Sequence, residues 1–209
     1  LNKKIIEDLI FDTGSNGHIS VPKNVIHSLN YEGQTTNKTY RTGSVTYGLY
    51  GLNKNDTTFY ARVNTASIGD LQLNDNIIEF KENSNLIGSK FLSDYIVILD
   101  WSSNLIYLKK TAIDSYDSLE TFGFKILLQN NKILIGSIFG NSEAWKKLKI
   151  GDEILEVNGE NYQDLTGPSL CDLYMSGTLN FDNTNQLKLK IKRSDTIVNI
   201  ILVKQTLLK

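Results

Sequence analysis

A single aspartate at the end of an apolar run constrains this chain more than any other feature of its 209 residues. Asp12 follows the apolar run 9–11. A carboxylate in an apolar surround costs several kcal/mol or takes up a proton, so its neighbours have to solvate it. Thr13 and Ser15 supply hydroxyl groups, and Gly14 lets the backbone bend sharply. We therefore expect this loop to hold an ionisable acid in a fixed place.

Three stretches of the first half resemble the pepsin-like family of aspartic proteases. Phe11-Asp12-Thr13-Gly14-Ser15, followed by Val21-Pro22, is similar to the family's active-site loop. Thr39-Tyr40-Arg41-Thr42-Gly43-Ser44 is similar to its flap, except that arginine replaces a glycine at a position where glycine gives mobility. Asn85-Leu86-Ile87-Gly88 matches the element of two hydrophobic residues and a glycine that crosses behind the catalytic loop. The stretches keep the family's order, and the resemblance covers residues 5–110.

This resemblance implies a lobe that carries half of an acid-protease site. In this enzyme class, two carboxyl groups share one proton, because like charges at such short range do not both ionise. The ionised carboxylate activates a water molecule, and the protonated one polarises the peptide carbonyl. The residues that the resemblance implies are Asp12 as the catalytic acid, Thr13, Gly14 and Ser15 as support of the active-site loop, and Tyr40, Gly43 and Ser44 in the flap.

The chain contains one Asp-Thr-Gly triplet, so the second catalytic carboxyl group has to come from elsewhere. Asp70, Asp75, Asp94 and Asp100 are not followed by Thr-Gly or Ser-Gly. Asp100 follows an apolar run, but its place is that of a closing hairpin, and we interpret it as structural. The second acid belongs either to a second copy of the chain, as in retroviral proteases, or to an upstream lobe, as in pepsin. Both remain open.

The second half resembles a PDZ domain over residues 120–209. Thr121-Phe122-Gly123-Phe124 is similar to the carboxylate-binding loop of that family, and the run from Leu148 to Gly159 is similar to its most specific sequence pattern. Within that run, Asn158-Gly159 predicts a primed hairpin turn. The resemblance implies a groove-lining helix over residues 165–175. It also implies that the backbone amides of Phe122, Gly123 and Phe124 hold the terminal carboxylate of a peptide that adds as a strand.

Two expectations follow for this second unit. The loop amides must approach the peptide closely, so we expect Gly123→Val to lower peptide affinity while the unit stays folded. The apolar density is low from Thr111 to Leu119 and rises again from Phe122 to Val203, so we expect residues 119–209 to fold independently.

The sequence predicts a mainly β fold. An aspartic-protease-like β-barrel lobe covers residues 1–110, a linker covers 111–119, and a small α+β PDZ domain covers 120–209. Short β-branched segments broken by Gly, Asn and Asp favour such a barrel. The predicted strands are 5–11, 18–21, 57–63, 77–80, a hairpin of 95–101 with 105–108, and 133–138, 153–157, 187–192 and 197–203. A mobile hairpin is predicted over 39–52 and helical segments over 23–29 and 89–93.

Composition excludes several function classes. A formal net charge of −1 gives no electrostatic case for nucleic acid, and no apolar run approaches the length of a membrane span. The single cysteine, Cys171, allows no internal disulfide, and two histidines with one cysteine make no metal set. We expect neither metal nor cofactor. The chain begins at Leu1 without methionine or a signal-like segment, so we interpret it as a fragment or processed form whose upstream sequence is missing. We expect the protein to be secreted or periplasmic.

The leading hypothesis is an aspartic endopeptidase that acts on polypeptide substrates. Its partner acid comes from another lobe or from a second subunit, and its PDZ module binds peptide ends or extended segments. Bacterial proteins that resemble this chain carry two such lobes before the PDZ domain. The alternative is a catalytically silent peptide-binding scaffold in which the Asp12 lobe survives without its partner.

Overall fold

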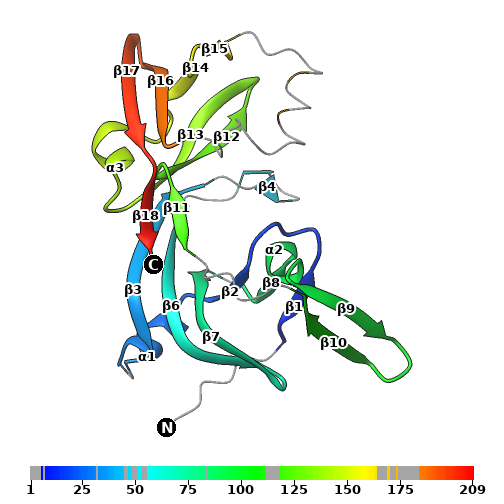
Figure 1. Cartoon of the computed structure of the whole chain (residues 1–209). Helices are drawn as coiled ribbons and strands as arrows, with labels where there is room; N and C mark the ends of the chain where they lie inside the picture. Colours follow the sequence, from blue (N-terminus) through cyan, green and yellow to red (C-terminus); the bar gives the residue numbers. More distant parts are fainter. Residues whose placement is uncertain are drawn as a thin grey trace. The chain divides into compact units, whose positions relative to one another are not determined.

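The structure, a computed structural model, is mainly β, as the sequence predicts. It describes residues 6, 8–31, 33–44, 47–48, 51–52, 56–82, 84–111, 118–163, 169, 173 and 184–209. The chain forms two compact units. Unit 1 comprises Leu1–Thr39, Thr58–Leu119 and Leu208–Lys209, and unit 2 comprises Tyr40–Thr57 and Glu120–Leu207 (Figure 1).

Unit 1 is built on a sheet whose neighbouring strands follow the order β1-β8-β2-β7-β6. These strands are β1 (Ile10–Asp12), β8 (Leu86–Gly88), β2 (Ile19–Pro22), β7 (Leu71–Lys81) and β6 (Asp56–Ile68). β1 pairs in parallel with β8, and β8 pairs antiparallel with β2. The short β8 therefore lies between the two strands that flank the Asp12 loop.

β1 begins at Ile10 rather than at residue 5, where the sequence predicted the first strand. Asp8 has φ 58°, in the left-handed region, and such a residue cannot continue an extended strand. Ile6 and Leu9 nevertheless pack against the core of unit 1. The apolar pattern before Ile10 thus reflects burial and not strand pairing.

The core of unit 1 is formed by its sheet together with two short helices, α1 (Val25–Tyr31) and α2 (Ser89–Leu92). Val25, Ile26 and Leu29 of α1 face this core, as their helical spacing predicted. β6 and β7 form its longest hairpin, with Ile68 paired to Leu71. The buried members of the core are Ile19, Val21, Val25, Ile26, Ala61, Val63, Leu73, Ile78, Phe80, Ile87, Phe91 and Leu92.

A second hairpin of unit 1 joins β9 (Tyr95–Asp100) to β10 (Leu105–Lys110), close to the predicted bounds. Asp100 Oδ1 accepts hydrogen bonds from the Ser102 hydroxyl at 2.6 Å and from the backbone N–H groups of Ser102 and Ser103 at 3.0 and 3.2 Å. These bonds, above all the one from the Ser102 hydroxyl, lower the pKa of Asp100. The carboxylate therefore supports the hairpin turn, as the sequence interpretation held.

Unit 2 contains a second set of paired strands, β13-β14-β16-β17, with β12 beside β13 and β15 beside β14. Asn158 and Gly159 join β14 to β15 with φ of 51° and 92°, which is the predicted primed turn. The bounds are β12 (Phe124–Gln129), β13 (Lys132–Phe139), α3 (Glu143–Lys147), β14 (Glu153–Val157), β15 (Glu160–Asn161), β16 (Gln186–Arg193) and β17 (Thr196–Val203).

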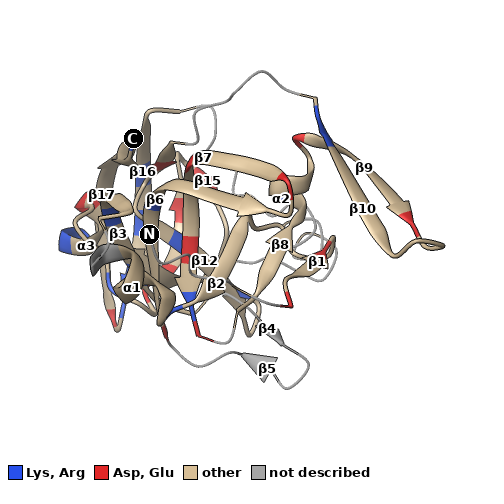
Figure 2. Cartoon of the chain, turned by 90° about the horizontal axis from the view of Figure 1, so that it is seen from below, with Lys and Arg blue, Asp and Glu red and all other residues tan. Residues whose placement is uncertain are grey.

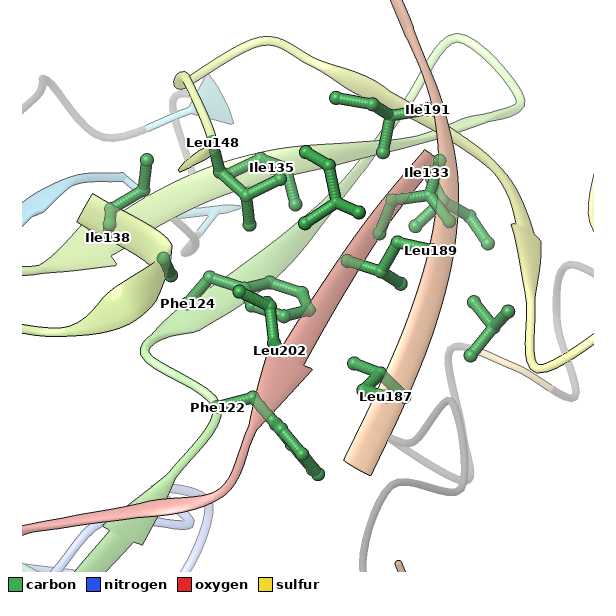
Figure 3. Close-up of a cluster of buried hydrophobic side chains, with 14 residues drawn as sticks. Phe122, Phe124, Ile133, Ile135, Ile138, Leu148, Leu187, Leu189, Ile191 and Leu202 are labelled. Atoms are coloured by element: carbon green, nitrogen blue, oxygen red, sulfur yellow. The ribbon is translucent and has the colours of Figure 1, made fainter. Parts of the chain in front are cut away.

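The side chains of unit 2 form one apolar cluster in which residues from β12, β13, β16 and β17 point toward one another (Figure 3). Ile133, Ile135, Leu187, Ile191 and Leu202 are fully buried there. At its margin, Asp152 accepts two hydrogen bonds from Arg193, at 2.8 and 2.6 Å, and one from the Lys149 backbone N–H. The segment at Gly151-Asp152 is thus tied to β16 by a bidentate ion pair.

The division into units differs from the predicted one at Tyr40–Thr57, which the sequence placed in the first lobe and which groups with unit 2. The reason is strand pairing: β3 (Thr35–Gly43) places Thr42 opposite Ile138 of β13. Beyond it, β4 (Tyr47–Gly48) pairs with β5 (Gly51–Leu52) within the predicted 39–52 hairpin. β11 (Leu119–Thr121) and β18 (Gln205–Leu208) form a separate pair.

Two predicted segments fall largely outside the described residues. Of the linker 111–119, the structure describes only Thr111, Ser118 and Leu119. Of the predicted helix 165–175, it describes Ser169 and Leu173, both of which are helical. Leu173 packs against the cluster of unit 2.

Burial predicts which isoleucines hold unit 2 together. Ile191 of β16 is fully buried, whereas Ile197 of the adjacent β17 is 57% exposed. Ile191→Ala should lower the free energy of unfolding by about 2–5 kcal/mol, because it leaves a cavity in the cluster. The matched change Ile197→Ala should cost no more than about 0.5 kcal/mol. Urea unfolding, followed through the amide signals of β16, measures both, and equal losses would contradict the burial assignment.

Candidate active site

Asp12 ends β1 and begins a tight loop that its own backbone and carboxylate stabilise. Asp12 Oδ1 accepts the Gly14 N–H at 2.9 Å, and the Asp12 carbonyl accepts the Ser15 N–H at 3.2 Å. Thr13 and Gly14 are exposed, while Asp12 and Ser15 are half-buried. Among the described residues, Oδ2 of Asp12 has no hydrogen-bond donor. The loop thus orients one carboxylate oxygen and leaves the other available.

The loop rests on Gly88, the last residue of β8. Gly88 lies opposite Asp12 in the parallel pairing, and its N–H donates to the His18 carbonyl at 2.7 Å. A Cβ at Gly88 would lie 2.3 Å from the Gly17 carbonyl oxygen and 2.9 Å from that of Ser15. Glycine is therefore required here by close approach of two backbones.

The first residues of α2 donate hydrogen bonds to the end of the Asp12 loop. The Ser89 N–H and hydroxyl both donate to the Ser15 carbonyl, at 2.7 and 2.8 Å, and the Lys90 N–H donates to the Gly17 carbonyl at 3.1 Å. Sequence reasoning identified the glycine after Leu86-Ile87 but missed Ser89. Its position immediately after that glycine was the available signal.

The residues that the structure describes do not complete a pair of acids around Asp12. Among the described residues, no other carboxyl group is hydrogen-bonded to Asp12. The same residues include no group of three or more His, Cys, Asp or Glu side chains that could hold a metal ion. Of the four other aspartates considered, Asp100 accepts hydrogen bonds within the β9–β10 turn. The backbone carbonyl of Asp94 accepts hydrogen bonds from the Thr111 N–H and hydroxyl. This site therefore provides one oriented carboxylate.

The predicted flap residues Tyr40, Gly43 and Ser44 gather on β13 and belong to unit 2, whereas Asp12 belongs to unit 1. The Tyr40 ring lies edge-on to Trp145, with ring centroids 5.8 Å apart, and its carbonyl accepts the Gly140 N–H. A Cβ at Gly140 would lie 2.3 Å from the Tyr40 ring. Any side chain at position 140 would overlap the Tyr40 ring, so the position of this ring in unit 2 requires glycine at 140.

Gly43 and Ser44 approach the same strand. Gly43 has φ 117°, and a Cβ there would lie 2.3 Å from the Gly136 carbonyl oxygen. That oxygen accepts the Ser44 N–H at 3.0 Å. The Ser44 hydroxyl is buried and has no hydrogen-bond partner within the described part of the chain.

Arg41, the departure from the pepsin flap pattern, also contacts β13. Its Nη1 donates to the hydroxyl of the fully buried Ser137 at 2.8 Å, and its guanidinium lies 5.9 Å from the centre of the Phe139 ring. A glycine at this position would make neither contact. Arginine here explains why the segment pairs with β13, a partnership that sequence reasoning did not anticipate.

The predicted carboxylate-binding loop, Phe122-Gly123-Phe124, enters β12. Both phenylalanine side chains are buried in the cluster of unit 2. The Gly123 N–H donates to Thr121 Oγ1 at 3.0 Å, and the Gly123 carbonyl accepts the Phe139 N–H at 2.8 Å. The amide at the centre of the loop is thus engaged within the protein.

The structure shows a steric cost of Gly123→Val that the sequence expectation did not include. Gly123 has φ 91°, and a Cβ there would lie 2.4 Å from the hydroxyl oxygen and 2.6 Å from the Cβ of Ser142. Ser142 is itself buried and caps α3 by accepting the Trp145 N–H. A larger residue at 123 therefore displaces the start of α3 before any peptide is involved.

Comparison with known proteins adds no family assignment, because no protein-family model and no curated protein matches this chain. In the described part of the chain, no helix has the length and apolar character needed to cross a membrane.

Gly123→Ala should destabilise unit 2 far more than Gly159→Ala. The two glycines have nearly the same φ, 91° and 92°, but a Cβ at Gly159 would meet nothing within 4 Å. Both variants bear the backbone strain of roughly 1–2 kcal/mol, and Gly123→Ala adds the clash with Ser142. Thermal unfolding monitored at the α3 amides compares them. A Gly123→Ala chain as stable as Gly159→Ala would refute the steric explanation.

Proposed function

We propose that this chain is one catalytic lobe of an aspartic-type endopeptidase joined to a peptide-binding PDZ-like unit. The observation that carries the proposal is the Asp12 loop: a half-buried carboxylate, oriented by the Gly14 N–H and backed by Gly88 across a parallel strand pair. A carboxylate whose orientation is set by the backbone is suited to activate a water molecule. The supporting loop residues are Thr13, Gly14 and Ser15.

In the proposed reaction, Asp12 and the acid of a second lobe share one proton and hold a water molecule between them. The ionised carboxylate takes a proton from the water as its oxygen attacks the peptide carbonyl, and the protonated acid donates to the carbonyl oxygen. No covalent enzyme intermediate forms: collapse of the tetrahedral intermediate breaks the C–N bond, and the amine leaves with the proton that the carboxylate took from the water. The free Oδ2 of Asp12 faces no donor of the described chain, which suits a water ligand.

Peptide binding by unit 2 is supported by the pairing of β12. In the described part of the chain β12 pairs with β13, and a peptide that adds as a strand would extend this pair. The loop Phe122-Gly123-Phe124 stands at the start of β12. Because a short added strand buries little area and must be ordered, we expect affinities on the order of micromolar or weaker.

The second candidate is a silent scaffold that binds peptides without cleaving them. It is favoured by one observation: Tyr40, Gly43 and Ser44 pair with β13 in unit 2, and none of these three is grouped with Asp12. In an enzyme, Asp12 is required for peptide cleavage. In a scaffold, substitution of Asp12 would affect only the stability of the fold.

Asp12→Asn should abolish cleavage of an unfolded protein substrate at acid pH, in a preparation that contains both lobes. The amide cannot serve as the base, so activity should fall at least about a thousandfold. Asp70→Asn, at the exposed β6–β7 turn, is the matched control and should keep full activity. Melting temperatures establish that both variants fold. Activity of Asp12→Asn above a few per cent of wild type would refute the catalytic role of Asp12, whereas absence of cleavage by the wild-type preparation would support the scaffold.

Unit 2 should bind peptides through their free C-terminus. A library of peptides, each made with a free and with an amidated C-terminus, is titrated into the whole chain while amide signals are followed. We expect shifts in β12 and around Gly123 with the free peptides, and at least about tenfold weaker binding after amidation, because the peptide carboxylate would take over the Gly123 N–H that now donates to Thr121 Oγ1. Shifts confined to β17 would contradict this site.

A further inference from the structure

β17 is apolar on both of its faces, although it stands at the end of the strand order of unit 2. Ile200 and Leu202 are buried in the cluster of unit 2. On the opposite face, Ile197, Ile201 and Val203 are 57%, 48% and 46% exposed. An antiparallel strand with one solvated face normally alternates apolar and polar residues. The outward apolar residues of β17 are therefore not explained by the core.

β16 keeps the normal alternation and places a row of lysines beside these residues. Its inward side chains are buried, and Lys188, Lys190 and Lys192 alternate with them on the other face. Strand pairing sets Lys188 opposite Ile201 and Lys192 opposite Ile197. Side chains that lie opposite each other in such a pair share one face of the sheet. We define the lysine–isoleucine face of unit 2 by Lys188, Lys190, Lys192, Ile197, Ile201 and Val203.

This face carries an excess of positive charge. Lys190 forms an ion pair with Glu156 of β14 at 2.6 Å. Within the described residues, the amines of Lys188 and Lys192 have no carboxylate partner. α3 adds the exposed Lys146 near the free edge of β17. In Figure 2, blue residues mark α3 and the strands beside it. The apolar row of β17 thus lies between cations from two elements.

α3 also closes part of the free edge of β17. The Val203 N–H donates to Glu143 Oε2 at 3.2 Å, and Lys147 Nζ donates to the Ile201 carbonyl at 2.8 Å. Glu143 and Lys147 are themselves ion-paired at 3.5 Å. Backbone groups that are occupied in this way are not available to an added strand. A ligand at Ile201 and Val203 therefore contacts the face of the sheet and not its edge.

The size and charge of the face favour a lipid surface over a folded protein partner. Three half-exposed aliphatic side chains offer at most on the order of a few hundred Å², whereas each partner of a standard protein interface gives roughly 800 Å². Binding to a membrane interface combines a small buried apolar area with the attraction of lysines to anionic lipids. Lysine stems also cover apolar surface while their amines reach outward to anions.

We propose that the lysine–isoleucine face lies against the surface of a membrane that contains anionic lipids. The three aliphatic side chains of β17 contact the boundary between headgroups and acyl chains, and the amines of Lys188 and Lys192 lie beside lipid phosphate groups. A neutral membrane would leave these amines without anions. This contact goes beyond the proposed function and depends neither on Asp12 nor on peptide binding.

Co-sedimentation of the 209-residue chain with lipid vesicles tests the contact. The chain should bind vesicles that contain about one-third phosphatidylglycerol at least about tenfold more tightly than vesicles of pure phosphatidylcholine. Added sodium chloride should weaken this binding, because salt screens the lysines. A wild-type chain that does not bind the anionic vesicles would overturn the proposal.

Ile201→Asp tests the apolar part of the contact. It places a carboxylate among the aliphatic side chains, so binding to the anionic vesicles should fall at least about tenfold. Ile96→Asp, in β9, is the matched control, with 50% exposure against 48% for Ile201, and should bind as the wild-type chain does. Thermal unfolding establishes that both variants fold. Folded Ile201→Asp that binds as tightly as Ile96→Asp would contradict the contact.

Lys188→Glu tests the charged part and serves where Ile201→Asp fails to fold. The reversal removes one attraction and adds one repulsion, so binding should weaken about tenfold at low ionic strength. Lys38→Glu, at an exposed lysine of β3, changes the net charge equally and should weaken binding much less. Losses of the same size in both variants would attribute binding to net charge and overturn the proposal.

Two competitors distinguish a lipid surface from other anions. Sodium phosphate and sodium chloride of equal ionic strength should weaken vesicle binding equally, because the contact is to a charged surface. A much stronger effect of phosphate would indicate a discrete phosphate site. Polyglutamate should compete no more strongly than either salt at that ionic strength, and tighter binding of polyglutamate than of vesicles would assign the face to an acidic polypeptide. Either of these two results would overturn the proposal.

Discussion

The close approach of two backbones at Gly88 is the contact on which the Asp12 site depends. Because Gly88 has no Cβ, the carbonyl groups of Ser15 and Gly17 come near enough to accept hydrogen bonds from Ser89 and Lys90. Those bonds fix the return of the loop, and the parallel pairing with β8 fixes its start. The position of one carboxylate is thus determined by backbone packing on both sides, which a side chain at Gly88 would prevent.

Local patterns predicted most of the strands and turns. The apolar runs of β9, β10, β13, β16 and β17 were placed to within a few residues. In β13 and β16 strand formation agrees with burial, whereas the apolar residues of β9 and β10 are largely exposed. The Asn158-Gly159 turn followed from the need for positive φ at two successive residues. The Asp12 loop and its support by Leu86-Ile87-Gly88 were recognised because both depend on short motifs. Features of this kind are encoded within a few residues and can be read without knowledge of the fold.

Long-range partners were not predictable in the same way. Tyr40, Gly43 and Ser44 contact Gly136 and Gly140, which lie roughly 100 residues away in the sequence. The sequence of neither segment predicts that the two segments pair. The steric cost of Gly123→Val was missed for the same reason, because Ser142 lies 19 residues away in the sequence and fills the space beside Gly123. In each case a glycine marked a close approach, but the sequence did not show what approached it.

The pairing of β3 with β13 makes unit 2 a discontinuous unit, which no single cut in the chain can release. A fragment that begins at residue 120 would lack Tyr40–Gly43, and Ser137 to Phe139 would lose the strand that covers them. Uncovered strand edges recruit strands from other molecules. Self-association of such a fragment would then result from the newly exposed edge of β13 and would not be a property of the intact protein. A soluble, minimal form of this unit would have to carry Tyr40–Thr57 as an added segment beside β13.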